Sequence, residues 1–573
     1  MTAESKIDET QKGLLPDPRT PKSLRKLFSK KLGFSKHNVH SAVLASADNR
    51  VEKVEEKADR TEYETTAREQ EVNQAREPPA INEESECELN SDIEKEISDL
   101  NDKGNEFFQK GEYDAAIRMY SEALKVLKNA GEENEGDNIS KGMRRFRTAR
   151  LLVNIGAVHI RRANYDDALS VLELSMRSSK LVPSNSIHYY RSCEVMADAL
   201  ENIGLVHFKK KDFEKSSDVY IDALEARRHC MELLSARFDK AKMSKSKEDV
   251  KKHIEETNAC KLDLANTLFY MCLLRERQGD IRQAIHSCEE SINLRREVHK
   301  NLPSDSSTLN LLTTVSRLYC NDGIRRYQDA LRYFHEVHRM KCEMLGRNHL
   351  EVASTLNNIA YLQMQLGDCK KCIDTSDRSI DIASNGRGLN KETCAAWTNK
   401  GDAYEKLGDR RNALSSYKTA LEVQKVFLGQ NDLANAELYE KMAGIYFKRK
   451  DLENAISLLE DAVEVKCEAL GPVKREVAST YIKLADYYEE DHDYSNSIRC
   501  HTKALRIFKH NDNKEGAAKE HNKIGGILKT VGDYNKSMEH YMQALWYSRE
   551  AKLPSIDPIV ADTIRNVASF QKR

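Results

Sequence analysis

The sequence contains little of what β-rich, membrane-spanning or secreted proteins usually carry. It has 24 glycines and 10 prolines in 573 residues, and this scarcity favours long helices. Aromatic residues make up only 7% of the chain, against 32% charged residues. No stretch approaches about 18 uncharged apolar residues, so we expect no transmembrane helix. The N-terminus, MTAESKIDET, has no apolar segment that would indicate a secretory signal, so we expect a cytoplasmic protein.

Charge and cysteine content argue against further classes. Lysine and arginine number 91 and aspartate and glutamate 92, a net charge of -1, so we expect no nucleic-acid binding by the chain as a whole. The 13 cysteines, without a secretory signal, are interpreted as reduced thiols. The closest pair, Cys369 and Cys372, lacks the second pair of ligands that a zinc site needs. We expect small buried apolar side chains there.

Signals of catalysis and cofactor binding are missing as well. We find no phosphate-cradling glycine loop, no nucleophile elbow and no paired Cys/His ligands. Histidines such as His159, His207 and His501 scatter through the expected helices without metal-ligand spacing. We therefore predict a protein that is not an enzyme, with no catalytic residue, no metal site and no cofactor.

What the sequence does contain is a repeated helical pattern, which is clearest in residues 394–421. Trp397, Gly401 and Tyr404 have the spacing i, i+4, i+7, which places them on one face of a helix. A Gly-Asp pair at 408–409 ends that helix. The same spacing then returns in a second helix, at Ala413, Tyr417 and Ala420. This pattern predicts a hairpin whose small residues let the two helices approach closely.

Copies of this hairpin recur from about residue 95, which indicates a repeat array rather than one core. In the second half of the chain the small residue of the first helix returns every 40 to 43 residues, at Ala360, Gly401, Ala443, Ala485, Gly525 and Ala568. The pattern resembles the tetratricopeptide repeat, W-x2-L-G-x2-Y followed by A-x3-F, although Lys400 stands in place of the leucine. The resemblance implies an all-α fold. We expect a right-handed superhelical solenoid of about ten hairpins with a C-terminal capping helix.

The domain organisation follows from where the repeat holds. Residues 1–94 lie outside it and are expected to be a disordered, charged tail. Within this tail, residues 19–36 form a short basic amphipathic segment; it is either a membrane-surface or partner-docking helix or a solvated basic stretch. Residues 95–570 are the predicted repeat array. Two insertions interrupt it, at 127–146 and 228–260, and the second is expected to be helix extensions or a mobile loop.

Residues 345–368, LGRNHLEVASTLNNIAYLQMQLGD, are similar to kinesin light chain. Its repeats begin with a similar sequence and have a period close to the 40 to 43 residues found here. Residues 469–488 are a second, weaker match. The resemblance implies a cargo adaptor that binds acidic peptides with an aromatic anchor, and a kinesin heavy chain as partner. Kinesin light chains hold the heavy chain through an N-terminal heptad coiled coil, and residues 1–94 show no such heptads. A general signalling or assembly scaffold is the alternative.

The first helices of such an array line its concave side. Two residues before the small position, seven copies carry an amide or an amine: Asn154, Asn202, Asn358, Asn399, Lys441, Lys483 and Lys523. Five residues after it, two copies carry Arg161 and Lys209. An amide can donate to and accept from the backbone of an extended peptide, and a lysine column favours carboxylates. We predict that these residues line a groove for peptide segments of partner proteins; the alternative is ordinary solvated side chains.

Overall fold

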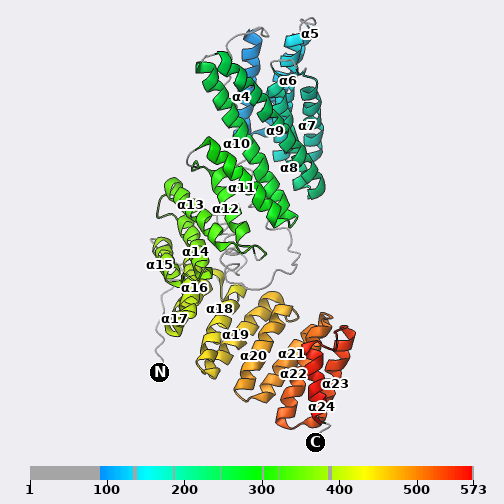
Figure 1. The fold of residues 1–573 in the computed structure, drawn as a ribbon, viewed down its shortest axis with the longest axis vertical. Coiled ribbons are helices and arrows are strands. Elements are labelled where there is room, and N and C mark those ends of the chain that lie inside the picture. The colour runs from blue at the N-terminus through cyan, green and yellow to red at the C-terminus, as the bar shows by residue number, and fades with distance from the viewer. Residues whose placement is uncertain are drawn as a thin grey trace, which may run out of the picture. The chain divides into compact units, whose positions relative to one another are not determined.

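The computed structural model describes residues 91–132, 138–182, 184, 188–244, 247–299, 302–321, 323–384 and 390–570 (Figure 1). These residues form helices and no strand, which confirms the predicted all-α class. They fall into two compact units, 91–375 and 376–570, and each is described by itself. The expected disordered tail and its basic segment lie outside the described residues, apart from 91–94, which belong to α4. The expected superhelix through both units stays a prediction.

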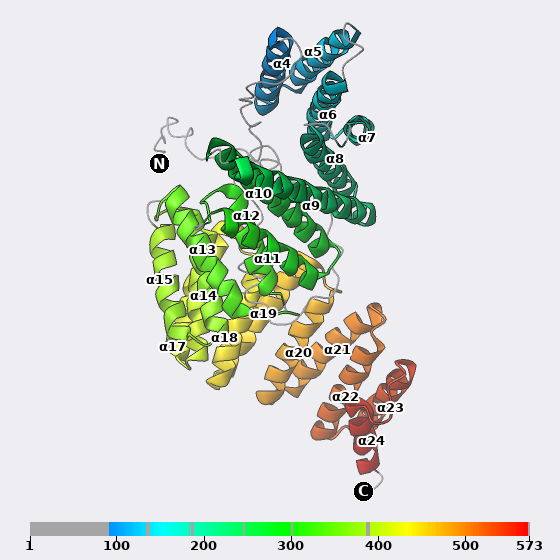
Figure 2. The ribbon, with the colours of Figure 1, turned by 45° about the horizontal axis from the view of Figure 1, so that its top comes forward.

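The unit of residues 91–375 contains consecutive helical hairpins. α4 packs on α5, α6 on α7, α8 on α9, α10 on α11 and α12 on α13 (Figure 2). The bounds are α4 Ser91–Gln109, α5 Tyr113–Glu132, α6 Asn138–Arg161, α7 Tyr165–Lys180, α8 Tyr189–Lys209, α9 Phe213–Ser244, α10 Lys247–Arg277, α11 Ile281–Val298, α12 Ser306–Tyr319, α13 Tyr327–Leu345 and α14 Leu350–Gln365. α15, Cys369–Ser384, spans the boundary between the units.

The unit of residues 376–570 continues the same architecture. Its hairpins are α16 with α17, α18 with α19, α20 with α21, and α22 with α23. The bounds are α16 Lys391–Lys406, α17 Arg410–Leu428, α18 Leu433–Lys448, α19 Leu452–Leu470, α20 Arg475–Glu490, α21 Tyr494–His510, α22 Lys514–Val531, α23 Tyr534–Glu550 and α24 Pro558–Phe570. α24 packs on α22 and α23, as expected of a terminal cap.

In five hairpins a glycine of the first helix faces a large side chain on the second helix. At Gly401 an added Cβ would lie 2.5 Å from a ring carbon of Tyr417, which is fully buried. Four other hairpins repeat this close approach, in the pairs Gly104–Tyr120, Gly156–Leu172, Gly204–Tyr220 and Gly525–Tyr541. The predicted break after α16 is also present: Gly408 has a φ of +81°, and the Asp409 carboxylate accepts from the backbone N–H of Asn412.

The two insertions prove to be mainly helix. α9 continues to Ser244 and α10 begins at Lys247. The second insertion therefore lengthens the second helix of one hairpin and the first helix of the next. In the first insertion, α5 continues to Glu132 and α6 begins at Asn138. Within 228–260 the described residues thus agree with the alternative of helix extensions. Cys369 and Cys372 are buried, as predicted from their positions in the pattern.

A pair of glycine-to-alanine substitutions tests the close approach. Gly401→Ala would press a methyl group against Tyr417, whereas a Cβ at Gly444 in α18 meets nothing within 4 Å. Overpacking costs about 1–3 kcal/mol, so we expect Gly401→Ala to destabilise its hairpin despite the gain in helix propensity. Gly444→Ala should stabilise by about 0.5–1 kcal/mol. Chemical denaturation of both variants measures the difference, and equal effects would contradict the packing.

Candidate peptide-binding surface

Four of the predicted side chains two residues before the small position contact the first helix of the preceding hairpin. In the unit of residues 91–375, the amide of Asn154 on α6 donates to Oδ1 of Asn101 on α4, 2.9 Å away. In the unit of residues 376–570, three lysines pair with acids on the first helix of the preceding hairpin. The Nζ–oxygen distances are 2.5 Å for Lys441–Asp402, 2.6 Å for Lys483–Glu440 and 3.7 Å for Lys523–Asp486. We call this set of contacts the cross-repeat ladder.

The contacts of the cross-repeat ladder limit how freely the lysine ammonium groups can bind a partner's carboxylates. Lys441 is held closely, with its side chain 21% exposed and its Nζ above the ring of Tyr417. Lys483 and Lys523 are 53% and 57% exposed. Their charges are already balanced by carboxylates of the array, which the sequence pattern did not indicate. A partner's carboxylate would therefore compete with Asp402, Glu440 and Asp486, and binding by the lysine column stays a prediction.

The predicted asparagines differ in what they contact. Asn202 on α8 and Asn358 on α14 are half-buried, and within the described part of the chain neither side chain makes a hydrogen bond. Asn399 on α16 is buried at 6% exposure. Arg161 and Lys209 end α6 and α8, where both are half-buried. Asn202 and Asn358 are thus the predicted amides most open to a new partner.

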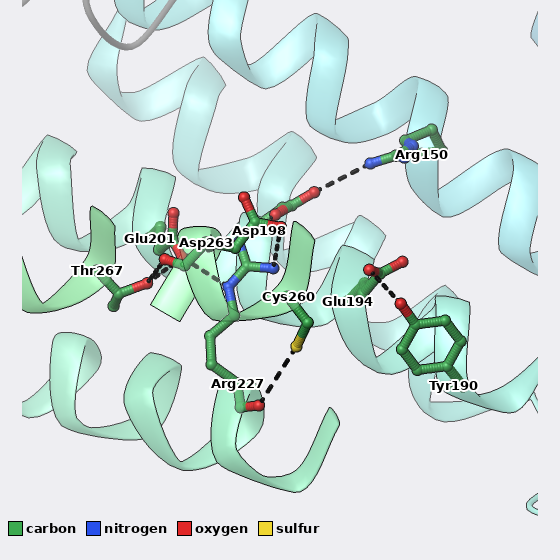
Figure 3. Close-up of polar contacts among 9 residues, drawn as sticks. All are labelled: Arg150, Tyr190, Glu194, Asp198, Glu201, Arg227, Cys260, Asp263 and Thr267. Carbon is green, nitrogen blue, oxygen red and sulfur yellow. Dashed lines mark hydrogen bonds and ion pairs between the residues drawn. The ribbon is translucent and has the colours of Figure 1, made fainter. Parts of the chain in front are cut away.

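A buried charged cluster, which the sequence pattern did not predict, lies among α8, α9 and α10 (Figure 3). At its centre is Arg227 of α9, with 1% of its side chain exposed. Its guanidinium donates to Oδ1 of Asp198 at 2.6 Å and to Oε1 of Glu201 at 2.9 Å, both on α8. Asp263 of α10 lies 3.5 Å away. Burial alone lowers the pKa of Arg227, but the three carboxylates raise it well above its usual range.

Neighbouring side chains extend this cluster. Arg150 of α6 pairs with the second oxygen of Asp198 at 3.0 Å. The hydroxyl of Thr267 on α10 donates to Oε1 of Glu201 at 2.5 Å. Glu194 accepts from the phenol of Tyr190 at 2.7 Å, and burial raises the pKa of that carboxyl. The cluster therefore joins α6, α8, α9 and α10 through polar groups that are almost all satisfied within the protein.

The position of Arg227 recurs in other hairpins. It lies seven residues after Tyr220, the side chain that packs on the small residue of the first helix. The same position holds Lys466 in α19, which contacts Glu440 of α18 and lies 2.9 Å from the hydroxyl of Thr480 on α20. In α11 it holds Arg295, which donates to Asn266 of α10 and Thr308 of α12. A cation at this position thus joins its own hairpin to the next one, and reading the hairpins in one register would have revealed it.

Family comparisons agree with this repeated geometry. Models of the tetratricopeptide repeat match residues 197–230, 308–351 and, in overlapping copies, 351–425, 392–468 and 432–510. These segments are tetratricopeptide repeats. The match at 308–351 includes α12 and α13, a hairpin whose first helix has no clear small position in the sequence. No curated protein matches the chain.

Several solved structures match parts of this chain with low TM-scores. BtubC (BKLC) from P. vanneervenii is 19% identical, and the match covers 42% of this chain and 95% of that one with a TM-score of 0.35. The nearly identical TPR-like repeats of a putative kinesin light chain from Podosopora anserina are 16% identical, covering 35% and 94% with a TM-score of 0.30. The apo form of RapI is 12% identical, covering 51% and 99% with a TM-score of 0.35. Likeness at this level carries no inference about partners.

Arg227→Met tests whether the buried cation holds neighbouring repeats together. Removing the cation leaves three carboxylates without their common partner, and breaking a buried pair costs about 3–5 kcal/mol. The adjacent Arg228 provides a control, since its side chain is 55% exposed and pairs with Glu290 at 3.4 Å. We expect faster hydrogen exchange in α8, α9 and α10 for Arg227→Met only. Equal protection in both variants would show that the cluster adds nothing to the repeat contacts.

The Glu440 carboxylate predicts a pH dependence. Burial by itself raises its pKa, but Lys466 and Lys483 lower it from 4.5 to about 2. A carboxylate with a lowered pKa stabilises the fold above its unfolded pKa, and this stabilisation is lost as the pH falls from about 5 toward 2. A lowering of this size corresponds to roughly 3 kcal/mol at neutral pH.

Thermal unfolding of Glu440→Gln between pH 7 and pH 3 measures this contribution. We expect the variant to be less stable than the parent at pH 7, with a difference that shrinks as the pH falls. Glu422→Gln, at an exposed position of α17, should match the parent throughout. A constant difference across the range would contradict the lowered pKa.

Proposed function

We propose that this protein is a non-catalytic scaffold that holds extended segments of partner proteins along its first helices. Tetratricopeptide repeats generally bind protein partners. The observation that carries the proposal is the regular placement of polar side chains two residues before the small position. They occur in seven hairpins, and in four of these, at Asn154, Lys441, Lys483 and Lys523, they form the cross-repeat ladder. Because an extended backbone offers donors and acceptors at regular intervals, such a row can bind it without reading one fixed sequence.

The asparagines of the unit of residues 91–375 contribute most to this proposal. Asn202 and Asn358 are half-buried, and each can both donate and accept. In the other unit, the lysines of the ladder favour an acidic segment able to displace the internal carboxylates. Lys483 and Lys523 are the accessible members. The expected partner is thus an extended segment with acidic residues.

Within this class, a kinesin-light-chain-like cargo adaptor in the cytoplasm is the finer proposal. Its support is the linker at 345–368. Gly346 ends α13 with a φ of +86°, and His349 caps α14 by accepting from the N–H of Glu351 at 3.2 Å. Gly429 and Gly471 end α17 and α19 in the same way. These linker residues act as helix caps, so they support the repeat type; kinesin heavy chain as a partner rests on the sequence resemblance alone.

Capture of partners with matched variants tests the proposal. The full chain, an Asn202→Ala/Asn358→Ala double variant and a control are used as baits, and bound segments are located by crosslinking and mass spectrometry. The control is Lys418→Ala/Glu422→Ala, at exposed positions of α17. We expect the amide variant to bind its partners about tenfold or more weakly, because it loses one to two hydrogen bonds worth about 1 kcal/mol each. The control should bind as tightly as the parent.

Each result bears on one part of the proposal. Equal capture by all three baits would contradict binding along the first helices. Recovery of a kinesin heavy chain with the parent would support the adaptor role. Other partners that depend on Asn202 and Asn358, without any motor, would leave a general signalling or assembly scaffold.

A further inference from the structure

His501 of α21 occupies the position that Tyr417 holds in α17. Each lies sixteen residues after the small residue of its first helix, Ala485 and Gly401 respectively. Both side chains are fully buried. A histidine at this position places a titratable, metal-binding ring inside a hairpin where other copies use a tyrosine, a leucine or another side chain without an imidazole.

The tyrosine shows which groups the tip of this side chain faces. The Tyr417 hydroxyl donates to Oδ1 of Asp402 at 2.5 Å and lies 3.3 Å from Oε2 of Glu405, both on α16. These acids stand one and four residues after Gly401. One and four residues after Ala485, α20 carries Asp486 and Glu489. The second hairpin thus keeps the two carboxylates but replaces the phenol with a shorter ring.

The two ring nitrogens of His501 have different surroundings. Nδ1 lies 2.7 Å from Oε2 of Glu520 on α22, a side chain that is only 3% exposed. A carboxylate can only accept, so this bond places a proton on Nδ1, and in the neutral ring the lone pair is then on Nε2. Nε2 has no hydrogen-bond partner among the described residues. A buried nitrogen lone pair without a donor is costly unless something else binds it.

The three possible ligands lie close together. One ligand atom from each of Asp486, Glu489 and His501 falls within 4.8 Å of the other two. We propose that these residues bind a divalent metal ion of the zinc type, with Glu520 as the group that orients the imidazole. Carboxylate-oriented histidines are the usual arrangement at zinc sites. A nitrogen ligand favours zinc, cobalt or nickel over calcium and magnesium, which prefer oxygen alone.

The charge balance agrees with a cation here. Asp486, Glu489 and Glu520 bring three carboxyl groups around one imidazole. Lys523 offsets only part of this charge, since its Nζ is 3.7 Å from Asp486 and both side chains are about half exposed. A divalent ion would complete the balance and tie α20 to α21, while Glu520 extends the link to α22 of the next repeat. Water can fill the remaining coordination positions on the exposed side of Asp486.

Sequence spacing could not reveal this set. Its members come from two helices of one hairpin, and the order Asp-x2-Glu followed by a histidine twelve residues later matches no common ligand motif. The expectation of no metal site was therefore drawn from local spacing alone, whereas the proposal rests on the hairpin register.

Cobalt(II) titration of the metal-stripped full chain tests the proposal, because cobalt reports its ligands by absorption. We expect one ion with visible bands but without the near-ultraviolet charge-transfer band of thiolate ligation, which separates this site from the cysteines. His501→Tyr restores the residue found at Tyr417 and should abolish these bands. Glu520→Gln should weaken binding by about 10- to 100-fold, as loss of an outer partner does at other sites. Glu405→Gln, in the sister hairpin, should change nothing.

The same titration can overturn the proposal. The proposal fails if the parent and His501→Tyr bind cobalt equally. It also fails if the spectrum shows thiolate ligation alone, or if no cobalt binds at millimolar concentration. Should His501→Tyr unfold, Asp486→Asn/Glu489→Gln replaces it, because these side chains are exposed or half-exposed and their melting can be matched to the parent. Retention of the bands in that double variant would equally contradict the site.

Discussion

The close approach of a glycine on the first helix and a large side chain on the second is the constraint on which five of the described hairpins depend. In these hairpins the first helix can lie against its partner because the contact position carries no side chain, as at Gly401 beneath Tyr417. Interiors are packed to crystal-like density, so even one added methyl group must displace something. The contact also fixes the register of the two helices, and this register sets which side chains face the next repeat.

Contacts between hairpins then carry the stability of the array, since each repeat touches mainly its neighbours. In several copies these contacts are apolar, but in others a buried cation such as Arg227 or Lys466 joins two hairpins through carboxylates and a threonine hydroxyl. Such pairs cost desolvation and are stabilising only where every group finds a partner. Arg227 meets this condition, with three carboxylates around one guanidinium.

The side chains available to partners are those that these internal contacts do not occupy. The lysines of the cross-repeat ladder serve the array first, and Lys441 is held most closely of them. Asn202 and Asn358 make no such contact within the described residues. The position of the large side chain on the second helix can also hold a different chemical group while it stays buried in the hairpin. The Tyr417 hydroxyl contacts Asp402 and Glu405, whereas the His501 ring brings a nitrogen within 4.8 Å of a carboxylate oxygen from each of the equivalent acids, Asp486 and Glu489.

Much of the fold follows from local spacing. The hairpins, their turn at Gly408 and the terminal cap α24 could all be predicted because helix periodicity and helix breakers act over a few residues. The 228–260 insertion could not be assigned, since a charged segment carries no period that distinguishes a helix extension from a loop. For the candidate surface, the sequence placed the side chains in one register but not their partners.

The sequence alone determined that this chain is an all-α array of tetratricopeptide-like hairpins, because each hairpin's pattern is complete within about 34 residues. Only the tertiary structure decided that Lys483 faces Glu440, that Arg227 gathers Asp198 and Asp263, and that Glu520 orients His501. These pairs join residues of different hairpins, or of the two helices of one hairpin. Which side chains stand opposite one another depends on how successive hairpins stack, and no local period in the sequence encodes that geometry.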